Sequence, residues 1–275
     1  MRRIISSFVR KFCSLFPRPI KYIPVYVPIL ETSLLTGRKA LITGGTGGIG
    51  FAMAESFLKA GAEVVIAGRN VEKLNDALKQ LSAFGKVSSL ILDVSNPNGF
   101  VDVVDAIGNF DVLVNNAGYV GGGTFGRTDQ SEYDKVFDTN LRGAYFLSQV
   151  VSRKWIADGV KGNILNVCSA SSLRPGNSPY ILSKWGLRSL TIGMARDLVK
   201  YGIVVNGIAP GSTNTPHFCS EGRIDITNQG NPTHRFVTMQ EVANLAVVMV
   251  SDLARMVVGD VLYVTGGAGI TTYDD

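Results

Sequence analysis

The sequence predicts one α/β domain built around a doubly wound, mostly parallel sheet of seven strands with helices on both faces. Three observations lead to this fold class. Short runs rich in Val, Ile and Leu, without polar alternation, are typical of strands buried on both faces of a sheet. These runs alternate with helical patterns along the chain. A length of 275 residues also suits one domain with a large core.

The first unit of the pattern is a strand, a glycine-rich turn, a helix and a second strand. The strands are expected at 39–43 and 62–67 and the helix at 51–60. Glycine permits positive φ and lets a phosphate approach the backbone at a helix N-terminus. The unit therefore predicts a dinucleotide site. Its expected residues are Thr43, Gly44, Thr46, Gly48, Ile49 and Gly50.

The alternation then continues along the chain. Further helices are expected at 71–81, 100–107, 131–155, 180–201 and 240–250, and further strands at 87–92, 111–115, 162–169, 203–208 and 260–264. Residues 1–36 stand outside the pattern, because prolines punctuate an extended connector there. We therefore divide the chain into an N-terminal arm and connector, 1–36, and the α/β domain, 37–275.

Composition excludes several classes of function. A hydrophobic content of 45% is typical of a globular chain, and no apolar run has the length of a membrane-spanning helix. Three widely spaced cysteines predict neither a disulfide framework nor a zinc site and fit a reducing compartment. The two histidines stand in no recognisable motif. We therefore expect no metal site.

The net charge of +5 comes from the N-terminal arm. Residues 1–30 hold six basic and no acidic residues, and the rest of the chain holds 21 basic and 22 acidic residues. The α/β domain is therefore not expected to bind nucleic acid. Within residues 1–16, apolar and basic side chains fall on opposite helical faces, which favours peripheral contact with an anionic membrane surface. Docking on a subunit and an organelle presequence are the alternatives. We expect a cytoplasmic protein, with this contact at the inner face of the membrane.

Tyr180 and Lys184 suggest the chemistry. A spacing of four residues places both side chains on one helix face. A tyrosine has an ordinary pKa of about 10, and a nearby ammonium favours the phenolate and lowers that pKa. Such a pair can move a proton. For the spacing taken alone, a surface Tyr beside a solvated Lys is the alternative.

With these pieces in place, residues 35–270 resemble the classical short-chain dehydrogenase/reductase family. The resemblance rests on an ordered set of motifs: residues 43–50, Asn115-Asn116-Ala117-Gly118, Asn140, Ser169, Tyr180-x-x-x-Lys184, and Pro210-Gly211 with Thr215. The glycine run also fits the pattern of the longer, sugar-nucleotide-modifying members, but the short C-terminal part favours the classical class. The resemblance implies a Rossmann fold, a nicotinamide cofactor, a small carbonyl or alcohol substrate, and a homo-tetramer or homo-dimer.

The resemblance also implies a catalytic set of Asn140, Ser169, Tyr180 and Lys184. Tyr180 would exchange a proton with the substrate oxygen, which Ser169 would polarise, and Lys184 would hold the nicotinamide ribose. Asn140 would hold a water in the proton relay. The offset of 11 residues between Ser169 and Tyr180 is shorter than expected, so Ser171 and Ser172 remain alternatives.

Arg69 predicts NADP over NAD. An acid that binds the ribose 2′-hydroxyl of NAD is expected near the end of the second strand, where this chain has Gly68 and then Arg69. A guanidinium pairs bidentately with phosphate. NAD with an uninvolved surface Arg is the alternative. By resemblance, the other cofactor contacts would be Asp93, Val94, Asn115, Ala117, Gly118, Tyr180, Lys184, Pro210, Gly211, Thr213 and Thr215.

The substrate segment is expected at 217–236. Its polar side chains favour a polar substrate such as a sugar derivative, with a solvated loop as the alternative; they are Glu221, Arg223, Asp225, Asn228, Gln229, Asn231 and Arg235. We therefore expect an NADP(H)-dependent oxidoreductase that interconverts a ketone or aldehyde and an alcohol. A 3-oxoacyl-thioester reductase is one rival. A non-catalytic NADP-binding regulatory or membrane-associated protein is the other.

Overall fold

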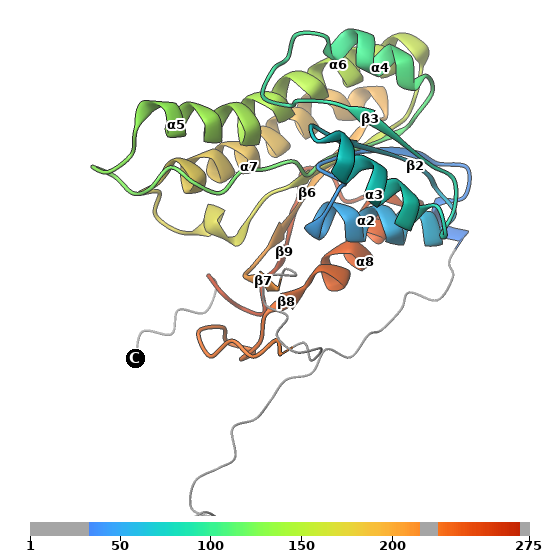
Figure 1. Ribbon diagram of the computed structural model, residues 1–275. Coiled ribbons are helices and arrows are strands. Elements are labelled where there is room, and N and C mark those ends of the chain that lie inside the picture. The colour runs from blue at the N-terminus through green and yellow to red at the C-terminus, as the bar shows by residue number, and fades with distance from the viewer. Residues whose placement is uncertain (1–32, 215–224, 270–275) are drawn as a thin grey trace, which may run out of the picture.

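The computed structural model describes residues 33–214 and 225–269 and places a seven-stranded sheet between two layers of helices (Figure 1). The strand order is β3-β2-β1-β4-β5-β6-β9, and every neighbouring pair is parallel. The expected doubly wound α/β fold is confirmed, and this sheet is parallel throughout. The strands are β1 (Lys39–Thr43), β2 (Glu63–Gly68), β3 (Val87–Ile91), β4 (Val112–Asn115), β5 (Asn163–Val167), β6 (Val204–Pro210) and β9 (Val261–Val264).

The central strands are buried on both faces, as their apolar sequences predict. Every residue of β4, β5 and β6 is buried. The edge strand β3 is different, because its sequence Val-Ser-Ser-Leu-Ile leaves Ile91 63% exposed. A separate two-stranded ladder pairs β7 (Thr213–Asn214) with β8 (Val237–Thr238) beyond the end of β6.

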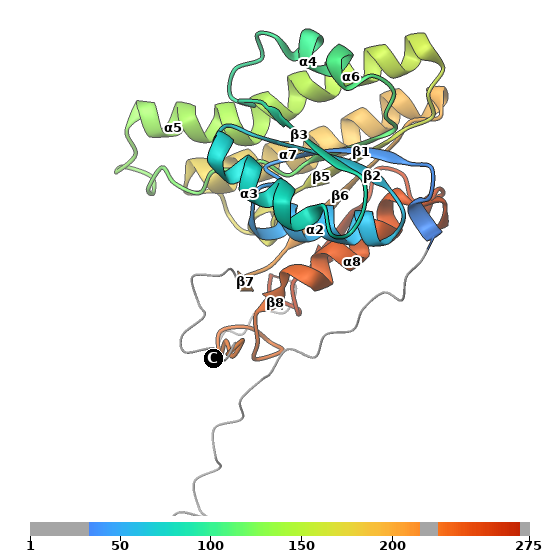
Figure 2. The same cartoon turned by 45° about the vertical axis from the view of Figure 1, so that its right-hand side comes forward.

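The helices form two layers, which Figure 2 shows in a turned view. One layer holds α2 (Gly48–Lys59), α3 (Val71–Leu81) and α8 (Met239–Val250), and the other holds α4 (Phe100–Ile107), α6 (Gly143–Asp158) and α7 (Pro179–Leu198). Each layer has its own apolar cluster against the sheet. The sheet is therefore covered on both faces, as a parallel sheet requires.

The long helix expected at 131–155 is three elements in the structure. α5 (Gln130–Phe137) leads into a π-helical turn, η2 (Asp138–Arg142), and then into α6. The turn is followed by a close contact at Gly143, where a Cβ would lie 2.2 Å from the Val94 carbonyl oxygen. π-helical turns occur often at functional sites, and this one contains Asn140.

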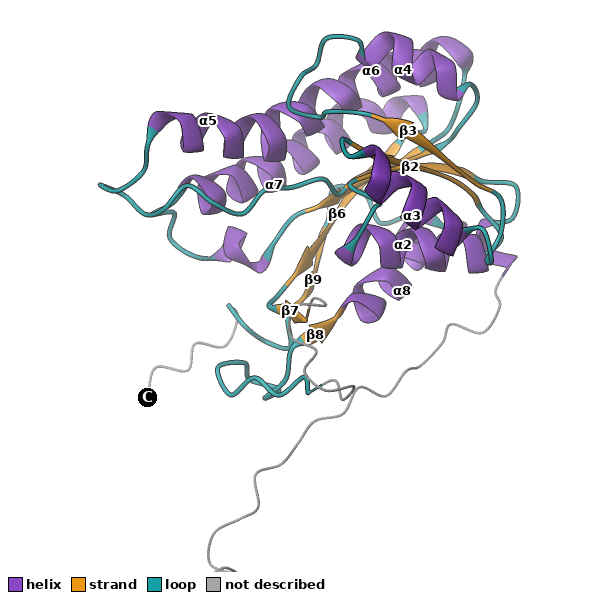
Figure 3. Ribbon diagram, viewed as in Figure 1, coloured by secondary structure: helices purple, strands orange, loops and turns teal. Residues whose placement is uncertain are grey.

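Local side-chain caps explain where several helices begin. Asn70 accepts a hydrogen bond from the Lys73 N–H at the start of α3, and Ser178 accepts one from Ile181 at the start of α7. Thr238 and Glu241 form a reciprocal capping box at the start of α8. Figure 3 shows the loops that join these helices to the strands.

The described chain begins with a short 3₁₀ helix, η1 (Ser33–Leu35). Leu35 is fully buried, and its N–H donates to the Ala60 carbonyl oxygen at 2.9 Å. Leu35 therefore belongs to the packed core, although its sequence context groups it with the connector. Within residues 33–214 and 225–269, no helix combines the length and apolar character that crossing a bilayer requires. Residues 1–16, where a membrane contact is expected, lie outside the described residues.

Candidate active site

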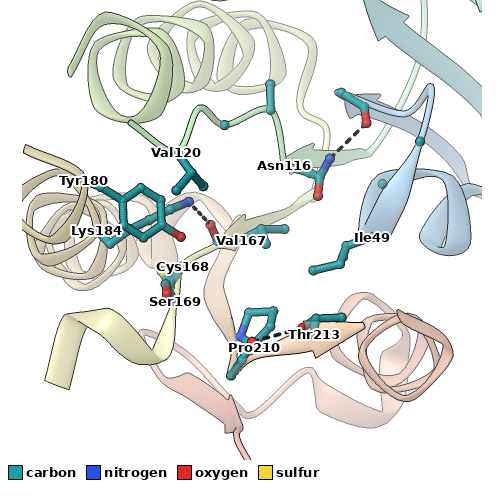
Figure 4. Close-up of a pocket in the computed structure, with 16 residues that line it drawn as sticks. Ile49, Asn116, Val120, Val167, Cys168, Ser169, Tyr180, Lys184, Pro210 and Thr213 are labelled. Atoms are coloured by element: carbon teal, nitrogen blue, oxygen red, sulfur yellow. Dashed lines mark hydrogen bonds between the residues drawn. The ribbon is translucent and has the colours of Figure 1, made fainter. Parts of the chain in front are cut away.

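A pocket of about 370 Å³ opens at the carboxyl ends of the central strands, where the strand order reverses between β1 and β4 (Figure 4). The turn after β1, the loop after β4, the end of β5, the start of α7 and the end of β6 all contribute to it. The pocket brings together these expected site residues: Gly44, Ile49, Gly50, Ala117, Gly118, Ser169, Tyr180, Lys184, Pro210, Gly211 and Thr213.

The glycine-rich turn packs closely against the loop after β4. A Cβ on Gly50 would lie 2.3 Å from the Asn116 Nδ2, which donates to the carbonyl oxygens of Thr43 and Gly44 at 2.9 and 3.1 Å. Thr43 is buried, and its Oγ1 accepts hydrogen bonds from the Asn116 and Ala117 N–H groups. Thr43 therefore shapes the site by holding two loops together.

The turn also leaves open space at the N-terminus of α2. A Cβ on Gly47 or on Gly48, which has a φ of +56°, would meet no described atom within 4 Å. Gly47 is the N-cap residue, and no side chain of the described chain caps α2. Backbone N–H groups at a helix N-terminus favour a phosphate. This open backbone turn fits the pyrophosphate of a dinucleotide.

Tyr180, Lys184 and Ser169 lie together on one side of the pocket, with Ile49 and Thr213 across from them (Figure 4). Burial raises the pKa of Tyr180, and a hydrogen bond with Ser169 lowers it by a smaller amount. A phenol in this state holds its proton and can donate it.

The spacing of Tyr180 and Lys184 predicted that the ammonium would lower the pKa of the phenol. In the structure, Lys184 has no such effect. The Lys184 Nζ donates to the Val167 carbonyl oxygen at 2.8 Å and lies 5.9 Å from the centre of the Tyr180 ring. Lys184 is 5% exposed, and burial lowers its own pKa. The ammonium is therefore directed to the end of β5. The prediction that the pKa of Tyr180 is lowered was wrong, because this pKa is raised.

Ser169 and its two alternatives have distinct places. Ser169 lines the pocket and also caps the short helix η3 (Ala170–Leu173), because its Oγ accepts the Ser171 N–H at 3.1 Å. Ser172 is fully buried, and its Oγ donates to the Ser169 carbonyl oxygen. Neither Ser171 nor Ser172 lines the pocket. The geometry therefore favours Ser169 as the hydroxyl that faces a substrate.

Asn140 lies behind the pocket rather than in its lining. Its Oδ1 accepts the Tyr119 N–H at 2.7 Å, and its Nδ2 donates to the Tyr119 carbonyl oxygen and to the Ser183 Oγ, both at 3.0 Å. The side chain thus has all its polar atoms engaged and fastens the loop after β4 to α7. A water in a proton relay would have to be held by its main chain.

Several other expected cofactor residues do not line the pocket. Arg69 Nη1 lies 3.9 Å from Asp93 Oδ2, and both side chains are exposed beyond the ends of β2 and β3. Val94 is buried, and Asn115 donates within the core to Ser148 and Asn166. Thr46 packs beside Gly68, because a Cβ on Gly68 would lie 3.1 Å from the Thr46 Cγ2. Thr215 lies outside the described residues.

The pocket also contains residues that the sequence did not single out as site residues: Gly47, Asn116, Val120, Val167 and Cys168. Cys168 and Val167 could have been suggested by their place next to Ser169. The described chain contains no cluster of three or more His, Cys, Asp and Glu side chains that could hold a metal ion.

Four polar residues of the expected substrate segment have partners within the protein. Asn231 is buried, and its Nδ2 donates to the Thr265 carbonyl oxygen at 2.9 Å. Arg235 forms an ion pair with Glu241 at 2.6 Å. Asp225 and Asn228 each accept a hydrogen bond from a backbone N–H two residues on. These four side chains are therefore engaged within the protein, whereas Gln229 is exposed, and Glu221 and Arg223 lie outside the described residues.

The chain matches known proteins over most of its length. Residues 38–223 match the family model of the short chain dehydrogenases. Gluconate 5-dehydrogenase of Gluconobacter oxydans (strain 621H) is 35% identical over 248 residues, which cover 86% of this chain and 96% of that protein. The 3-oxoacyl-(acyl-carrier-protein) reductase of Aquifex aeolicus (strain VF5) is 31% identical over 243 residues, with 85% and 98% covered. The crystal structure of a gluconate 5-dehydrogenase from Burkholderia cenocepacia J2315, in complex with NADP and tartrate, aligns with a TM-score of 0.79 at 31% identity and covers 88% of this chain and 99% of that one.

Proposed function

The chain belongs to the short-chain dehydrogenase/reductase family, and we propose that it interconverts a small polar ketone or aldehyde and its alcohol with NADP(H). The family consists of oxidoreductases that act on alcohol and carbonyl groups with a nicotinamide cofactor. The observation that carries the proposal is the meeting of the glycine-rich turn, Ser169, Tyr180 and Lys184 in one pocket.

The residues present fit the pyrophosphate and the nicotinamide ribose of the dinucleotide. Gly47, Gly48 and the N-terminus of α2 would hold the pyrophosphate. Lys184 would hold the ribose next to the nicotinamide, for which it would exchange its hydrogen bond to Val167. When bound, the cofactor supplies or accepts the hydride. The protein's own residues then have to move one proton and orient one oxygen.

Tyr180 and Ser169 would perform this proton chemistry. Burial keeps the Tyr180 phenol protonated, so that it can donate its proton to the carbonyl oxygen during reduction and recover it during oxidation. The Ser169 hydroxyl interacts with that phenol and lowers its pKa, and it would donate to the same substrate oxygen. Asn140 would keep the wall of the site in place through its hydrogen bonds to Tyr119.

The surroundings of Gly68 support the preference for NADP. No acid stands where NAD enzymes bind the ribose 2′-hydroxyl, and Thr46 occupies the space in which a side chain on Gly68 would lie. The guanidinium of Arg69 is exposed. It could bind a 2′-phosphate after its ion pair with Asp93 is broken. The similar structure from Burkholderia cenocepacia J2315 is a complex with NADP.

A small polyhydroxylated substrate is supported by similarity. The gluconate 5-dehydrogenases of Gluconobacter oxydans and Burkholderia cenocepacia J2315 are 35% and 31% identical to this chain. The rival substrate class is a 3-oxoacyl thioester, which the similarity to the reductase of Aquifex aeolicus supports at 31% identity. Both substrate classes use the same proton chemistry, so the site residues do not discriminate between them.

The rival of another class is a non-catalytic NADP-binding protein. The burial of Lys184 and Asn140 argues against a non-catalytic protein. Their side chains carry polar groups, yet the residues are only 5% and 1% exposed. Burying polar groups costs free energy that a binding site formed by the glycine turn alone would not require.

A carbonyl panel tests the proposal. NADPH oxidation would be measured with keto-sugar acids, simple sugars and 3-oxoacyl thioesters, with NADH in parallel and with Tyr180→Phe as the inactive control. We expect turnover with NADPH and a keto-sugar acid. Turnover confined to 3-oxoacyl thioesters supports the rival substrate class, and no turnover with any carbonyl supports the non-catalytic alternative.

The proposal has four further parts: a division of the chain at residue 36, a homo-tetramer or homo-dimer, a cytoplasmic location, and membrane contact through residues 1–16. The amphipathic and basic sequence of the arm supports the membrane contact. Co-sedimentation with anionic vesicles should be lost when residues 1–30 are deleted. Equal sedimentation of both proteins refutes this part alone.

A further inference from the structure

We propose that Arg188 and Tyr263 are positioning residues that hold Ser169 in place beside Tyr180, through the short helix η3. Neither residue lines the pocket, so each would act through η3 and not on the substrate. The inference rests on the proposed function, because the placement of Ser169 affects turnover only if Ser169 acts in the reaction.

The position of Ser169 is tied to that of Ser172 within η3. Ser172 Oγ donates to the Ser169 carbonyl oxygen at 2.7 Å, and the Ser169 Oγ accepts the Ser171 N–H at 3.1 Å. Ser172 is fully buried. A movement of Ser172 would therefore move the backbone that carries the Ser169 hydroxyl.

Two other elements hold Ser172. On α7, the Arg188 Nη1 donates to the Ser172 carbonyl oxygen at 3.4 Å. On β9, the Tyr263 hydroxyl lies 3.3 Å from the Ser172 Oγ. The Arg188 guanidinium also lies 5.4 Å from the centre of the Trp185 ring and 6.0 Å from that of Tyr263, as in cation–π contacts. Arg188 thus links α7, β9 and η3.

The far end of η3 is fastened to α7 as well. The Trp185 Nε1 donates at 2.7 Å to the carbonyl oxygen of Arg174, the C-cap residue that follows η3. The chain then passes close to α7, because a Cβ on Gly176 would lie 2.7 Å from the Leu182 Cδ2. The loop between the two hydroxyl-bearing residues is therefore held at several points.

The same helix carries Tyr180, Lys184 and Arg188 at successive intervals of four residues. This spacing places the three side chains along one stripe of α7. With only 11 residues of offset between Ser169 and Tyr180, the loop has little slack. A shift of η3 would change the separation of the two hydroxyls, and small misplacements of reacting groups cost rate.

Arg188→Met and Tyr263→Phe test the inference, with Arg196→Met as the matched control on the same helix. Arg196 is exposed, and its guanidinium pairs only locally with Asp197 at 3.0 Å. We expect each test variant to lower kcat about five- to tenfold at an unchanged NADPH dissociation constant. Because the Ser169 hydrogen bond lowers the pKa of Tyr180, both variants should also raise that pKa in a spectrophotometric titration of the cofactor-free protein. The control should change neither quantity.

The double variant Ser169→Ala/Arg188→Met distinguishes this inference from the proposed function. If Arg188 acts through Ser169, adding Arg188→Met to Ser169→Ala lowers kcat no further. Tyr263→Phe keeps the aromatic ring and removes only the hydroxyl. It therefore provides the test if Arg188→Met does not fold. The inference is overturned if a folded test variant keeps both the wild-type kcat and the wild-type pKa of Tyr180. It is also overturned if the losses of kcat caused by Arg188→Met and Ser169→Ala multiply in full in the double variant. Wild-type turnover by both Ser169→Ala and Tyr180→Phe would instead refute the proposed function.

Discussion

Burial is the largest influence on the ionisation of Tyr180. It raises the pKa of the phenol above its ordinary value of 10.0, and the hydrogen bond with Ser169 acts in the opposite direction. In the cofactor-free protein, Tyr180 is therefore prepared to give a proton rather than to take one. This state suits the reduction of a carbonyl.

The cofactor-free protein should hold the Tyr180 proton above pH 10.0, and Ser169→Ala should raise this pKa further. Since the folded protein keeps a proton that the unfolded chain loses, the contribution of Tyr180 to stability is present below pH 10.0 and lost as the pH rises through the folded pKa. The difference in phenolate absorbance between the wild type and Tyr180→Phe measures this pKa. A midpoint below 10.0 would contradict the assignment.

Arg69 should set the preference between the two nicotinamide cofactors. Arg69→Ala removes a charged donor to the 2′-phosphate, worth about 1.5–3 kcal/mol, so NADPH affinity should fall roughly 10- to 100-fold while NADH affinity stays the same. Arg255→Ala is the matched control, because Arg255 is likewise exposed and paired with one Asp. Equal NADPH affinities in both variants would argue against a 2′-phosphate contact.

Local patterns predicted the Tyr180 and Lys184 pair but not its ionisation. Helix periodicity depends only on neighbouring residues, so the spacing placed both side chains on one wall of the pocket. The acceptor of Lys184 is a carbonyl oxygen on β5, 17 positions earlier in the chain. The motif at 115–118 includes Asn116, but it does not reveal that the Asn116 side chain binds Thr43 and Gly44 on another loop.

The π-helical turn η2 gives Asn140 its role at the scale of an element. Asn140→Ala would remove the partner of the Tyr119 N–H and carbonyl groups and one of the two hydrogen bonds of the Ser183 hydroxyl, which also donates to the Tyr180 carbonyl oxygen. We expect a loss of about 2–4 kcal/mol in the free energy of unfolding. Denaturant titration measures it, with exposed Asn98→Ala as the control. Equal stability of the two variants would show that these hydrogen bonds contribute little.

The capping box of α8 should make part of the stability depend on pH. The ion pair with Arg235 is the main reason that the pKa of Glu241 lies below 4.5, and burial opposes it. A lowered pKa means that Glu241 contributes stability above pH 4.5, which is lost as the pH falls through its folded pKa.

Glu241→Gln should therefore cost about 1 kcal/mol at neutral pH and nothing in strong acid. Thermal unfolding across acidic pH measures this, with Glu72→Gln in the first turn of α3 as control. A pH-independent cost would exclude the ion pair as its cause.

Element boundaries were predictable where caps or glycines are local. The bounds of α3 and α4 agree with the expected 71–81 and 100–107. The break in the expected helix 131–155 was not predictable, because it accompanies the close approach of Gly143 to Val94 on another segment. The hydrogen bond of Asn231 in the substrate segment was not predictable either, because its acceptor is the carbonyl oxygen of Thr265, far along the chain.

The whole molecule combines a predictable architecture with contacts that only the fold reveals. Alternating strands and helices predicted the parallel sheet, and the site lies at its switch point as such folds dictate. At the opposite ends of the strands, Arg38 on the segment before β1 bonds to Asp111 before β4 and to Asn163 on β5. No periodicity reveals this cluster, because its members are separated by up to 125 positions.

The central claim is that one pocket of this molecule reduces a carbonyl with a proton from Tyr180. Steady-state NADPH oxidation by Tyr180→Phe, together with its NADPH dissociation constant, tests the claim most directly. We expect kcat to fall at least about 100-fold with the dissociation constant unchanged, since general acid catalysis is lost and cofactor binding is not. Wild-type turnover by a folded Tyr180→Phe protein would contradict the claim.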